Sequence, residues 1–149
     1  MEAITEARRH IDNAKGFLRN NANKEDGLYK DKKYVKIAGH TAYTGILLAL
    51  DELLGEKRKK TKKSVEWYQK ELSGLDKRVT SDFATAYQIL HLDMGYEGTP
   101  SAKLAKIGIE EAEMLLCLEL LERIASSTAL LEGGPLPAGT ATTAVFTVT

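Results

Sequence analysis

The sequence predicts an all-α protein: an up-and-down antiparallel four-helix bundle made from five helical segments, followed by an irregular or strand-like C-terminal tail. Apolar residues recur at spacings of three and four in several stretches, which is the period of an amphipathic helix. Short polar or glycine-containing breaks separate these stretches, and short loops favour antiparallel neighbours. The composition then changes near Ser126. We therefore expect a helical bundle domain over residues 1–125 and a Gly-, Pro- and Thr-rich tail of low charge over residues 126–149.

The composition excludes several classes of protein. The 149 residues are 43% hydrophobic, and 21 basic side chains balance 21 acidic ones, so the chain can bury a core and is not disordered throughout. The single cysteine, Cys117, excludes a disulfide scaffold and is expected to be a core residue. The sequence has no apolar run of membrane-spanning length and no signal-peptide pattern at its start. These features predict a cytoplasmic protein with no membrane partner.

The first helix is predicted from about Glu2 to Asn20. Its apolar face carries Ile4, Ala7, Ile11, Ala14 and Leu18. Asparagines follow this face, and because Asn favours caps and turns they are expected to end the helix. A short polar loop is then expected through Gly27.

The second helix is predicted from about Lys32 to Leu54 and is ended by Gly55. Gly39 and Gly45 lie inside it, although a glycine costs about 1 kcal/mol relative to alanine in a helix interior. We therefore expect another helix to approach closely at these two positions.

The remaining helices follow from similar signals. A third helix is predicted over about 62–75, with Val65, Tyr68, Leu72 and Leu75 on one face. A fourth begins near Thr80-Ser81-Asp82, a cluster typical of a helix N-cap, and His91 lies at its end, before a turn flanked by Gly95 and Gly98. Thr99 and Pro100 then predict the start of the last helix, which runs to about Ala125 and is expected to be the most buried. Its inward positions are predicted to be Leu104, Ile107, Ala112, Leu115, Leu118 and Leu120 or Leu121.

The tail has a composition of its own. Residues 133–149 carry no charged side chain, and the segment ends in an alternating stretch of high β-propensity over residues 144–149. A single strand has no partner within a helical chain. Four alternatives stay open: the tail is disordered, lies on the bundle, pairs with another chain, or is an appended extension.

The sequence contains no motif for a metal or a cofactor. His10, His40 and His91 are not spaced by three or four residues, and no Glu-x-x-His pair of a bundle metal site is present. No P-loop or dinucleotide-binding glycine pattern occurs either. We therefore expect neither a metal nor a cofactor.

A basic stretch over residues 57–63 is the strongest charge feature, with six basic residues in seven. Its first four members, Lys57, Arg58, Lys59 and Lys60, are candidates for contact with an acidic or phosphate-bearing partner. The simpler interpretation is a solvated loop, and the net charge of zero argues against general nucleic-acid binding.

Four further residues are candidates for a binding site. His40 and His91 are the histidines suited to act as a general base, but catalysis needs an oriented partner and the sequence shows none. Tyr43 lies close to His40 on the second helix, and Trp67 is adjacent to Tyr68, so that both cannot face the core. A structural role in a helix contact is the competing interpretation for each of them.

Several stretches resemble an uncharacterised bacterial helical family, one of the domains of unknown function, over about residues 3–123. They are ARRHIDNAK (7–15), KEDGLYKDKKYVKIAGHTAYTGILLALDELL (24–54), KSVEWYQKEL (63–72) and AYQILHLDMGYEG (86–98). The arrangement is also similar to the HEPN (higher eukaryotes and prokaryotes nucleotide-binding) bundles. That resemblance implies the same fold and a tendency to dimerise, and some HEPN proteins are ribonucleases or partners of nucleotidyltransferases.

The chain departs from the HEPN nuclease motif, in which an Arg precedes a His by four to six intervening residues. Arg78 precedes His91 by thirteen positions, and no other pair fits. The departure argues against nuclease activity.

Three functions therefore stay open. The first is a non-catalytic, cytoplasmic helical interaction module that homodimerises. The second is an RNA- or nucleotide-handling protein that uses His40 or His91, with Lys32, Lys33 or Arg78 holding phosphate. The third is a subunit whose C-terminal strand mediates assembly with another chain.

Overall fold

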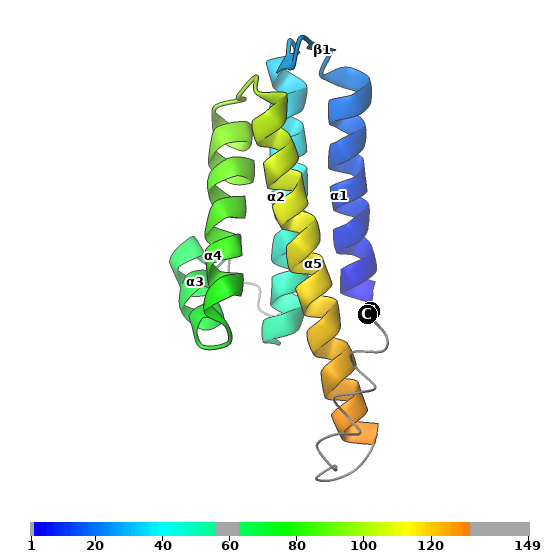
Figure 1. The fold of residues 1–149 in the computed structure, drawn as a ribbon, viewed down its shortest axis with the longest axis vertical. Helices are drawn as coiled ribbons and strands as arrows, with labels where there is room; N and C mark the ends of the chain where they lie inside the picture. Colours follow the sequence, from blue (N-terminus) through cyan, green and yellow to red (C-terminus); the bar gives the residue numbers. More distant parts are fainter. Residues whose placement is uncertain (1, 56–62, 132–149) are drawn as a thin grey trace.

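The computed structural model describes residues 2–55 and 63–131, and it describes side chains as far as Leu118. In order, the chain forms α1 (Glu2–Asn21), β1 (Lys24–Glu25), β2 (Leu28–Tyr29), α2 (Lys32–Leu54), α3 (Val65–Ser73), α4 (Lys77–Ala86), the π-helix η1 (Tyr87–Tyr96) and α5 (Ala102–Leu131). Helix α4 continues directly into η1, so that the pair forms one rod. Figure 1 shows four antiparallel rods, α1, α2, α4–η1 and α5, with the short α3 beside one end of α4. The predicted up-and-down bundle is confirmed.

The first two helices match their predicted bounds closely. All five predicted apolar residues of α1 are buried, from Ile4 to Leu18. Helix α2 has the predicted bounds of Lys32 and Leu54, and Gly55 ends it in the left-handed conformation, with φ 73°. The period of three and four therefore determined both helices, because each buries one continuous face.

The glycines of α2 mark close helix crossings, as expected. A Cβ atom added at Gly45 would lie 2.9 Å from the Ala7 carbonyl oxygen of α1. At Gly39 it would lie 2.7 Å from the Met94 Cβ and 2.8 Å from the Gly95 backbone nitrogen of η1. Real Cβ contacts are not this short, so both crossings require glycine.

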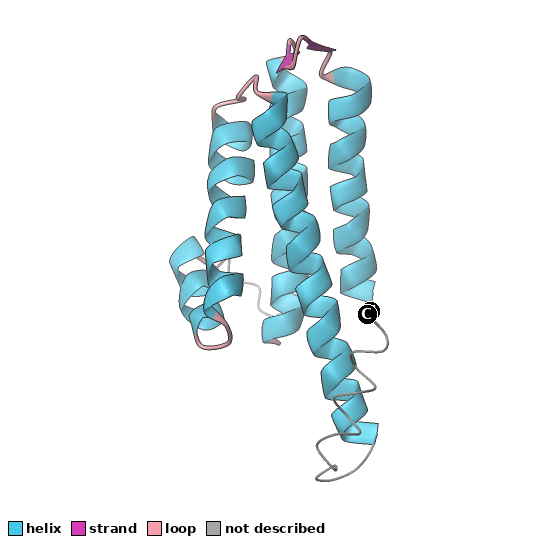
Figure 2. Cartoon of the chain, in the orientation of Figure 1, coloured by secondary structure: helices cyan, strands magenta, loops and turns pink. Residues whose placement is uncertain are grey.

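The α1–α2 connection is more ordered than the predicted loop. Lys24 pairs with Tyr29 and Glu25 with Leu28 in a two-stranded antiparallel hairpin, visible at the top of Figure 2. Its two-residue loop, Asp26-Gly27, has positive φ at both positions, 53° and 78°, as a type I′ turn requires.

The predicted bounds of the middle helices are partly wrong. Helix α3 ends at Ser73, so Leu75 lies in the following turn and is 60% exposed. Helix α4 begins at Lys77 instead of near Thr80, because the carboxylate of Asp76 caps it by accepting a hydrogen bond from the Arg78 backbone N–H at 2.7 Å. Gly95 lies inside η1 instead of beside a turn.

The last helix differs from its prediction at both ends and in its burial. It begins at Ala102, and the Ser101 hydroxyl, in place of Thr99, accepts a hydrogen bond from the Leu104 N–H at 3.1 Å. It continues to Leu131 instead of ending near Ala125. Ala112 and Leu115 are buried as predicted, but Ile107 is 40% exposed and Cys117 is exposed. The expectation that this helix is the most buried was wrong, because over residues 102–118 one side of α5 faces solvent, whereas α2 buries nine residues.

Two carboxylates face each other between α4 and α5. The Asp82 Oδ2 and Glu111 Oε2 atoms are buried, and neither accepts a hydrogen bond from the described residues. Burial, and secondarily the charge of Asp82, raises the pKa of Glu111 above its ordinary value.

Within residues 2–55 and 63–131, no helix is long and apolar enough to cross a membrane.

The Gly39 crossing predicts a large effect from one methyl group. Gly39→Ala should lower the free energy of unfolding by about 1–3 kcal/mol, because the backbone of η1 has to move away. Gly16→Ala is the matched control, since among the described residues no atom outside the adjacent backbone of α1 lies within 4 Å of the added methyl. That control should be neutral or stabilising by up to about 1 kcal/mol. Denaturant unfolding measures both, and equal effects of the two substitutions would contradict the assigned contact.

The carboxylate pair predicts a stabilising substitution. Glu111→Gln should raise the free energy of unfolding at neutral pH by a few tenths to about 1 kcal/mol, because it removes one of two facing charges. Because the pKa of Glu111 is raised in the folded state, the stability of the wild type falls as pH rises through the pKa of this carboxyl group. The gain in stability of Glu111→Gln over the wild type should therefore disappear in acid, where Glu111 is protonated. The exposed neighbour provides the control, Glu110→Gln. Thermal unfolding at several pH values tests this, and a destabilised Glu111→Gln variant at neutral pH would contradict it.

Candidate functional site

A cluster of histidine and tyrosine rings lies where α2 crosses η1. The Tyr43 and His91 rings stack with their centroids 4.7 Å apart. The centroid of the Tyr87 ring lies 5.2 Å from that of His91. His40 lies 5.7 Å from His91 in an edge-to-face arrangement. Tyr96 contacts both histidines edge-on, at 5.0 Å from His91 and 5.8 Å from His40. The structure therefore brings together three of the predicted site residues, His40, Tyr43 and His91, and adds Tyr87 and Tyr96.

The π-helix accounts for this arrangement. The Glu97 N–H donates to the Leu92 carbonyl, five residues back, at 2.9 Å. Residues four or five apart then share a face, which aligns Tyr87, His91 and Tyr96. In an α-helix, a residue five positions on would be rotated by about 140°. A sequence pattern based on the α-helical period therefore could not group Tyr96 with His91.

Glycine also brings the two histidines together. A Cβ atom added at Gly95 would lie 2.8 Å from the Cε1 atom of His40, so the imidazole lies directly over the η1 backbone. Because Gly39 and Gly95 carry no side chain, α2 and η1 approach closely enough for the His40 and His91 rings to come into contact.

The electrostatics of the cluster favour a neutral imidazole. Burial, and secondarily the nearby His40, lowers the pKa of His91 below its ordinary value of 6.5. Its Nδ1 atom is buried and has no hydrogen-bond partner among the described residues. Burial, and secondarily Tyr87, raises the pKa of the Tyr43 phenol, which therefore stays protonated at neutral pH. The stacked pair at the centre of the cluster, His91 and Tyr43, is therefore favoured in its uncharged form.

Among the residues that the structure describes, no carboxylate forms a hydrogen bond that would orient His91. The Asp93 carboxylate accepts a hydrogen bond from the Gln88 side-chain amide at 3.0 Å instead of orienting His91. Among the described residues, no group of three or more His, Cys, Asp or Glu side chains is placed to hold a metal ion. The geometry suits packing and stacking better than proton transfer.

Trp67 is connected to the cluster through a chain of rings. Phe83 lies 6.3 Å from Tyr43 and 5.8 Å from Tyr68, and Tyr68 lies 5.1 Å from Trp67. Tyr68 is buried and Trp67 half-buried, which confirms that the adjacent pair cannot both face the core. Trp67 belongs to the first turn of α3 and packs against the core, and the Lys63 ammonium lies over its ring at 5.6 Å from the ring centre.

An aspartate fixes this end of the ring chain. The Tyr68 hydroxyl donates to Asp51 Oδ1 at 2.7 Å, and Lys63 Nζ lies 3.4 Å from the same oxygen. Burial, and secondarily the Asp51 hydrogen bond, raises the pKa of Tyr68. The last cation of the basic stretch, Lys63, therefore contacts other residues of the bundle, Asp51 and the Trp67 ring.

Of the other predicted cations, those that the structure describes have their contacts away from the histidines. Lys57, Arg58, Lys59 and Lys60 lie outside the described residues. Lys33 lies over the Tyr34 ring at 5.5 Å, and the alkyl chain of Lys32 packs near Gly98. Arg78 lies in the first turn of α4, about 20 Å along the rod from His91.

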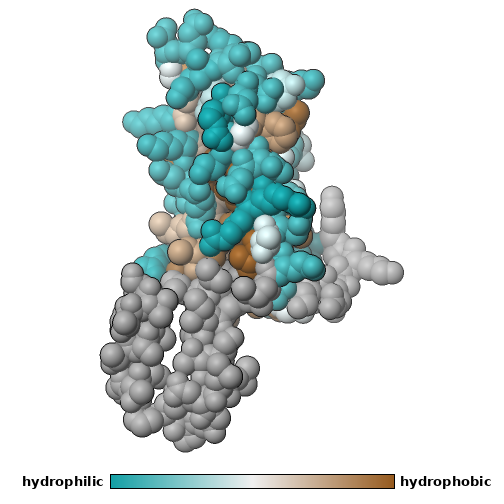
Figure 3. Space-filling view, turned by 90° about the vertical axis from the view of Figure 1, so that its right-hand side faces the viewer, coloured by the Kyte–Doolittle hydropathy of each residue, from teal (hydrophilic) through white to brown (hydrophobic). Residues whose placement is uncertain are grey.

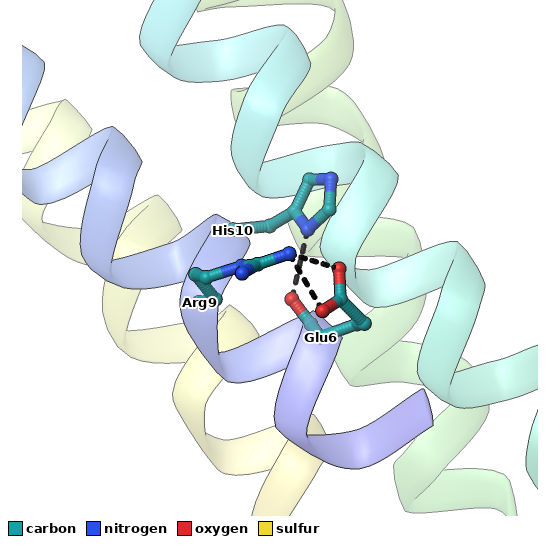
Figure 4. A network of polar contacts seen from close by, with 3 residues as sticks. All are labelled: Glu6, Arg9 and His10. Atoms are coloured by element: carbon teal, nitrogen blue, oxygen red, sulfur yellow. Dashed lines mark hydrogen bonds and ion pairs between the residues drawn. The ribbon is translucent and has the colours of Figure 1, made fainter. Parts of the chain in front are cut away.

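The third histidine has a structural role in α1. Figure 4 shows His10 Nδ1 at 2.8 Å from the Glu6 carbonyl oxygen, while Arg9 binds both carboxylate oxygens of Glu6 at 2.6 and 2.7 Å. A carbonyl oxygen only accepts, so Nδ1 of His10 carries the proton. His10 Cβ also lies at the close crossing near Gly45.

The half-buried His91 predicts a pH-dependent stability. The lowered pKa means that the unfolded chain binds a proton more readily than the folded one. Stability should therefore be fully present above pH 6.5 and should fall as pH drops below it. His91→Phe preserves the ring stack and should reduce this fall. Denaturant unfolding of both proteins between neutral and mildly acidic pH tests this, and an unchanged pH dependence in the variant would contradict the assignment.

Comparison with known proteins finds a family and a solved structure that are both described as of unknown function. Residues 2–120 match the model of a family described as a domain of unknown function (DUF5618). A solved structure, described as a protein of unknown function from Dyadobacter fermentans, is 44% identical and superposes with a TM-score of 0.73. That match covers 79% of this chain and 92% of the other. No curated protein matches the chain. Since the family model covers well over half of the sequence, the chain belongs to the DUF5618 family of helical proteins.

Proposed function

We propose that the chain is a non-catalytic, cytoplasmic helical interaction module that forms a homodimer through the outer face of α5. The observation that carries this proposal is a stripe of exposed apolar residues on that face. Ile107 is 40% exposed and Met114 is 51% exposed, and the exposed Cys117 follows at helical spacing. Large apolar side chains that repeat along one exposed helix face favour contact with another helix.

The spacing of the stripe favours a second copy as the partner. Met114 lies seven residues after Ile107, Cys117 three after that, and the sequence continues the alternation of four and three at Leu121 and Ile124. Such a repeat forms the seam of a two-stranded coiled coil, in which each helix presents the same stripe. Residues 107–131 span about three and a half heptads, and six of the eight positions of this repeat are apolar, the exceptions being Glu110 and Thr128.

The position of α5 supports the same partner. Figure 1 shows α5 continuing well past the ends of α1 and α2. A matching helix packed alongside this extension would stabilise it, because most helical stability in proteins comes from tertiary packing. Figure 3 shows one side of the molecule, which is mostly hydrophilic, with hydrophobic surface beside the residues drawn in grey and in a second area higher up.

The histidine cluster favours the non-catalytic alternative. His91 is held between aromatic rings, its Nδ1 has no partner among the described residues, and Asp93 is directed to Gln88. An RNA- or nucleotide-handling protein of the HEPN type stays a prediction, and the distance of Arg78 from His91 gives it no support. Assembly through the C-terminal strand concerns residues outside the described part of the chain.

A single charge in the stripe tests the homodimer. The wild-type protein should have about twice its chain mass of 16.4 kDa in light scattering, and Met114→Glu should shift it to the monomer. A buried, unpaired carboxylate in an apolar seam opposes association. Leu75→Glu is the matched control, because Leu75 is 60% exposed but lies in the turn after α3, and this variant should stay dimeric. A monomeric wild type, or a dimer unaffected by Met114→Glu, would overturn the proposal.

A further inference from the structure

A groove of about 440 Å³ lies between α1, the β1–β2 hairpin and α5. Its apolar lining includes Leu18 and Ile109, both buried, and the half-buried ring of Tyr29. The volume lies within the range of small-molecule sites, and apolar walls with a few polar groups are typical of them. The groove contains none of the histidines discussed above.

The rim of the groove carries an excess of positive charge. Four cations line it, Lys15 and Arg19 from α1, Lys24 from β1 and Lys106 from α5, against two carboxylates, Glu110 and Glu113. Lys15 Nζ is paired with Glu113 Oε2 at 3.0 Å. Within the described residues, Arg19, Lys24 and Lys106 form no ion pair, so three cations face a single remaining carboxylate, and the groove has two positive charges in excess.

The hairpin holds one wall of the groove in place. The Tyr29 N–H donates to the Pro100 carbonyl at 2.7 Å, and the Ala102 N–H donates to the Gly27 carbonyl at 3.0 Å. These bonds attach the hairpin to the start of α5. Since Lys24 pairs with Tyr29 across the hairpin, both residues have a fixed backbone position beside α5. A fixed wall lowers the entropic cost of binding.

Tyr29 supplies a neutral donor at the groove. Burial raises the pKa of its phenol above the ordinary value, so the hydroxyl keeps its proton at neutral pH. The ring offers an apolar surface and the O–H a hydrogen bond, which suits a ligand with both an apolar and an anionic part.

We propose that this groove binds a small phosphomonoester with an apolar, planar body, with Arg19, Lys24 and Lys106 holding the phosphate. A phosphomonoester carries close to two negative charges at neutral pH, which matches the excess positive charge of the rim. The Arg19 guanidinium can contact two phosphate oxygens at once. Leu18, Ile109 and the Tyr29 ring contact the apolar body. The inference is independent of the proposed homodimer.

Calorimetric titration of the full chain with three probes tests the inference. Phenyl phosphate carries both parts of the ligand, inorganic phosphate only the anion, and phenol only the ring. We expect phenyl phosphate to bind more tightly than either of the other two. The variant Arg19→Ala/Lys106→Ala should weaken phenyl phosphate by about tenfold or more for each cation removed.

A charge-matched control separates a built site from general attraction of anions. Lys77→Ala/Arg78→Ala also removes two exposed cations, but from the first turn of α4, and should leave the affinity unchanged. Circular dichroism verifies that both variants are folded. Three outcomes would overturn the inference: no binding of phenyl phosphate, equal binding of inorganic phosphate, or the same loss of affinity in both double variants.

Discussion

The close contact between α2 and η1 is the constraint on which the rest of the structure depends. At Gly39 and Gly95 the two backbones approach within the distance that a side chain would occupy. This approach brings His40 onto the η1 backbone and His91 into the ring stack with Tyr43. Because Tyr43 also contacts Phe83, and Phe83 contacts Tyr68, the ring chain extends from η1 to α3 and fixes that helix against the bundle.

The sequence predicts the α-helical parts of the fold well and the other parts poorly. The apolar residues of α1 and α2 repeat every three or four residues, so the bounds of both helices and the buried face of α1 follow directly. The π-helix does not have that period, which is why Tyr96 looked like part of a turn although it contacts both histidines. The hairpin was missed although Asp26-Gly27 is a recognisable type I′ pair, because the flanking segments are only two residues long.

The errors in α5 have a different physical origin. A run such as Leu115–Leu118 is apolar on every side, and the periodicity alone does not say whether one or several neighbours cover it. Leu115 and Leu116 are buried, whereas Cys117 is exposed, because Cys117 lies on the side of α5 that faces away from the neighbouring helices. The candidate site was predicted only as separate residues for a similar reason. His40 and His91 are about fifty positions apart in the sequence, and only the helix crossing brings them into contact.

The docking of the hairpin on α5 has a consequence for the order in which the protein folds. The hydrogen bonds between residues 27–29 and residues 100–102 join parts of the chain separated by roughly seventy residues. The entropic cost of closing such a long loop is met only after α2 and the α4–η1 rod have bridged the distance. Formation of this contact is therefore a late event that reports on completion of the whole bundle. The Tyr29 environment provides a natural marker for the last step of folding.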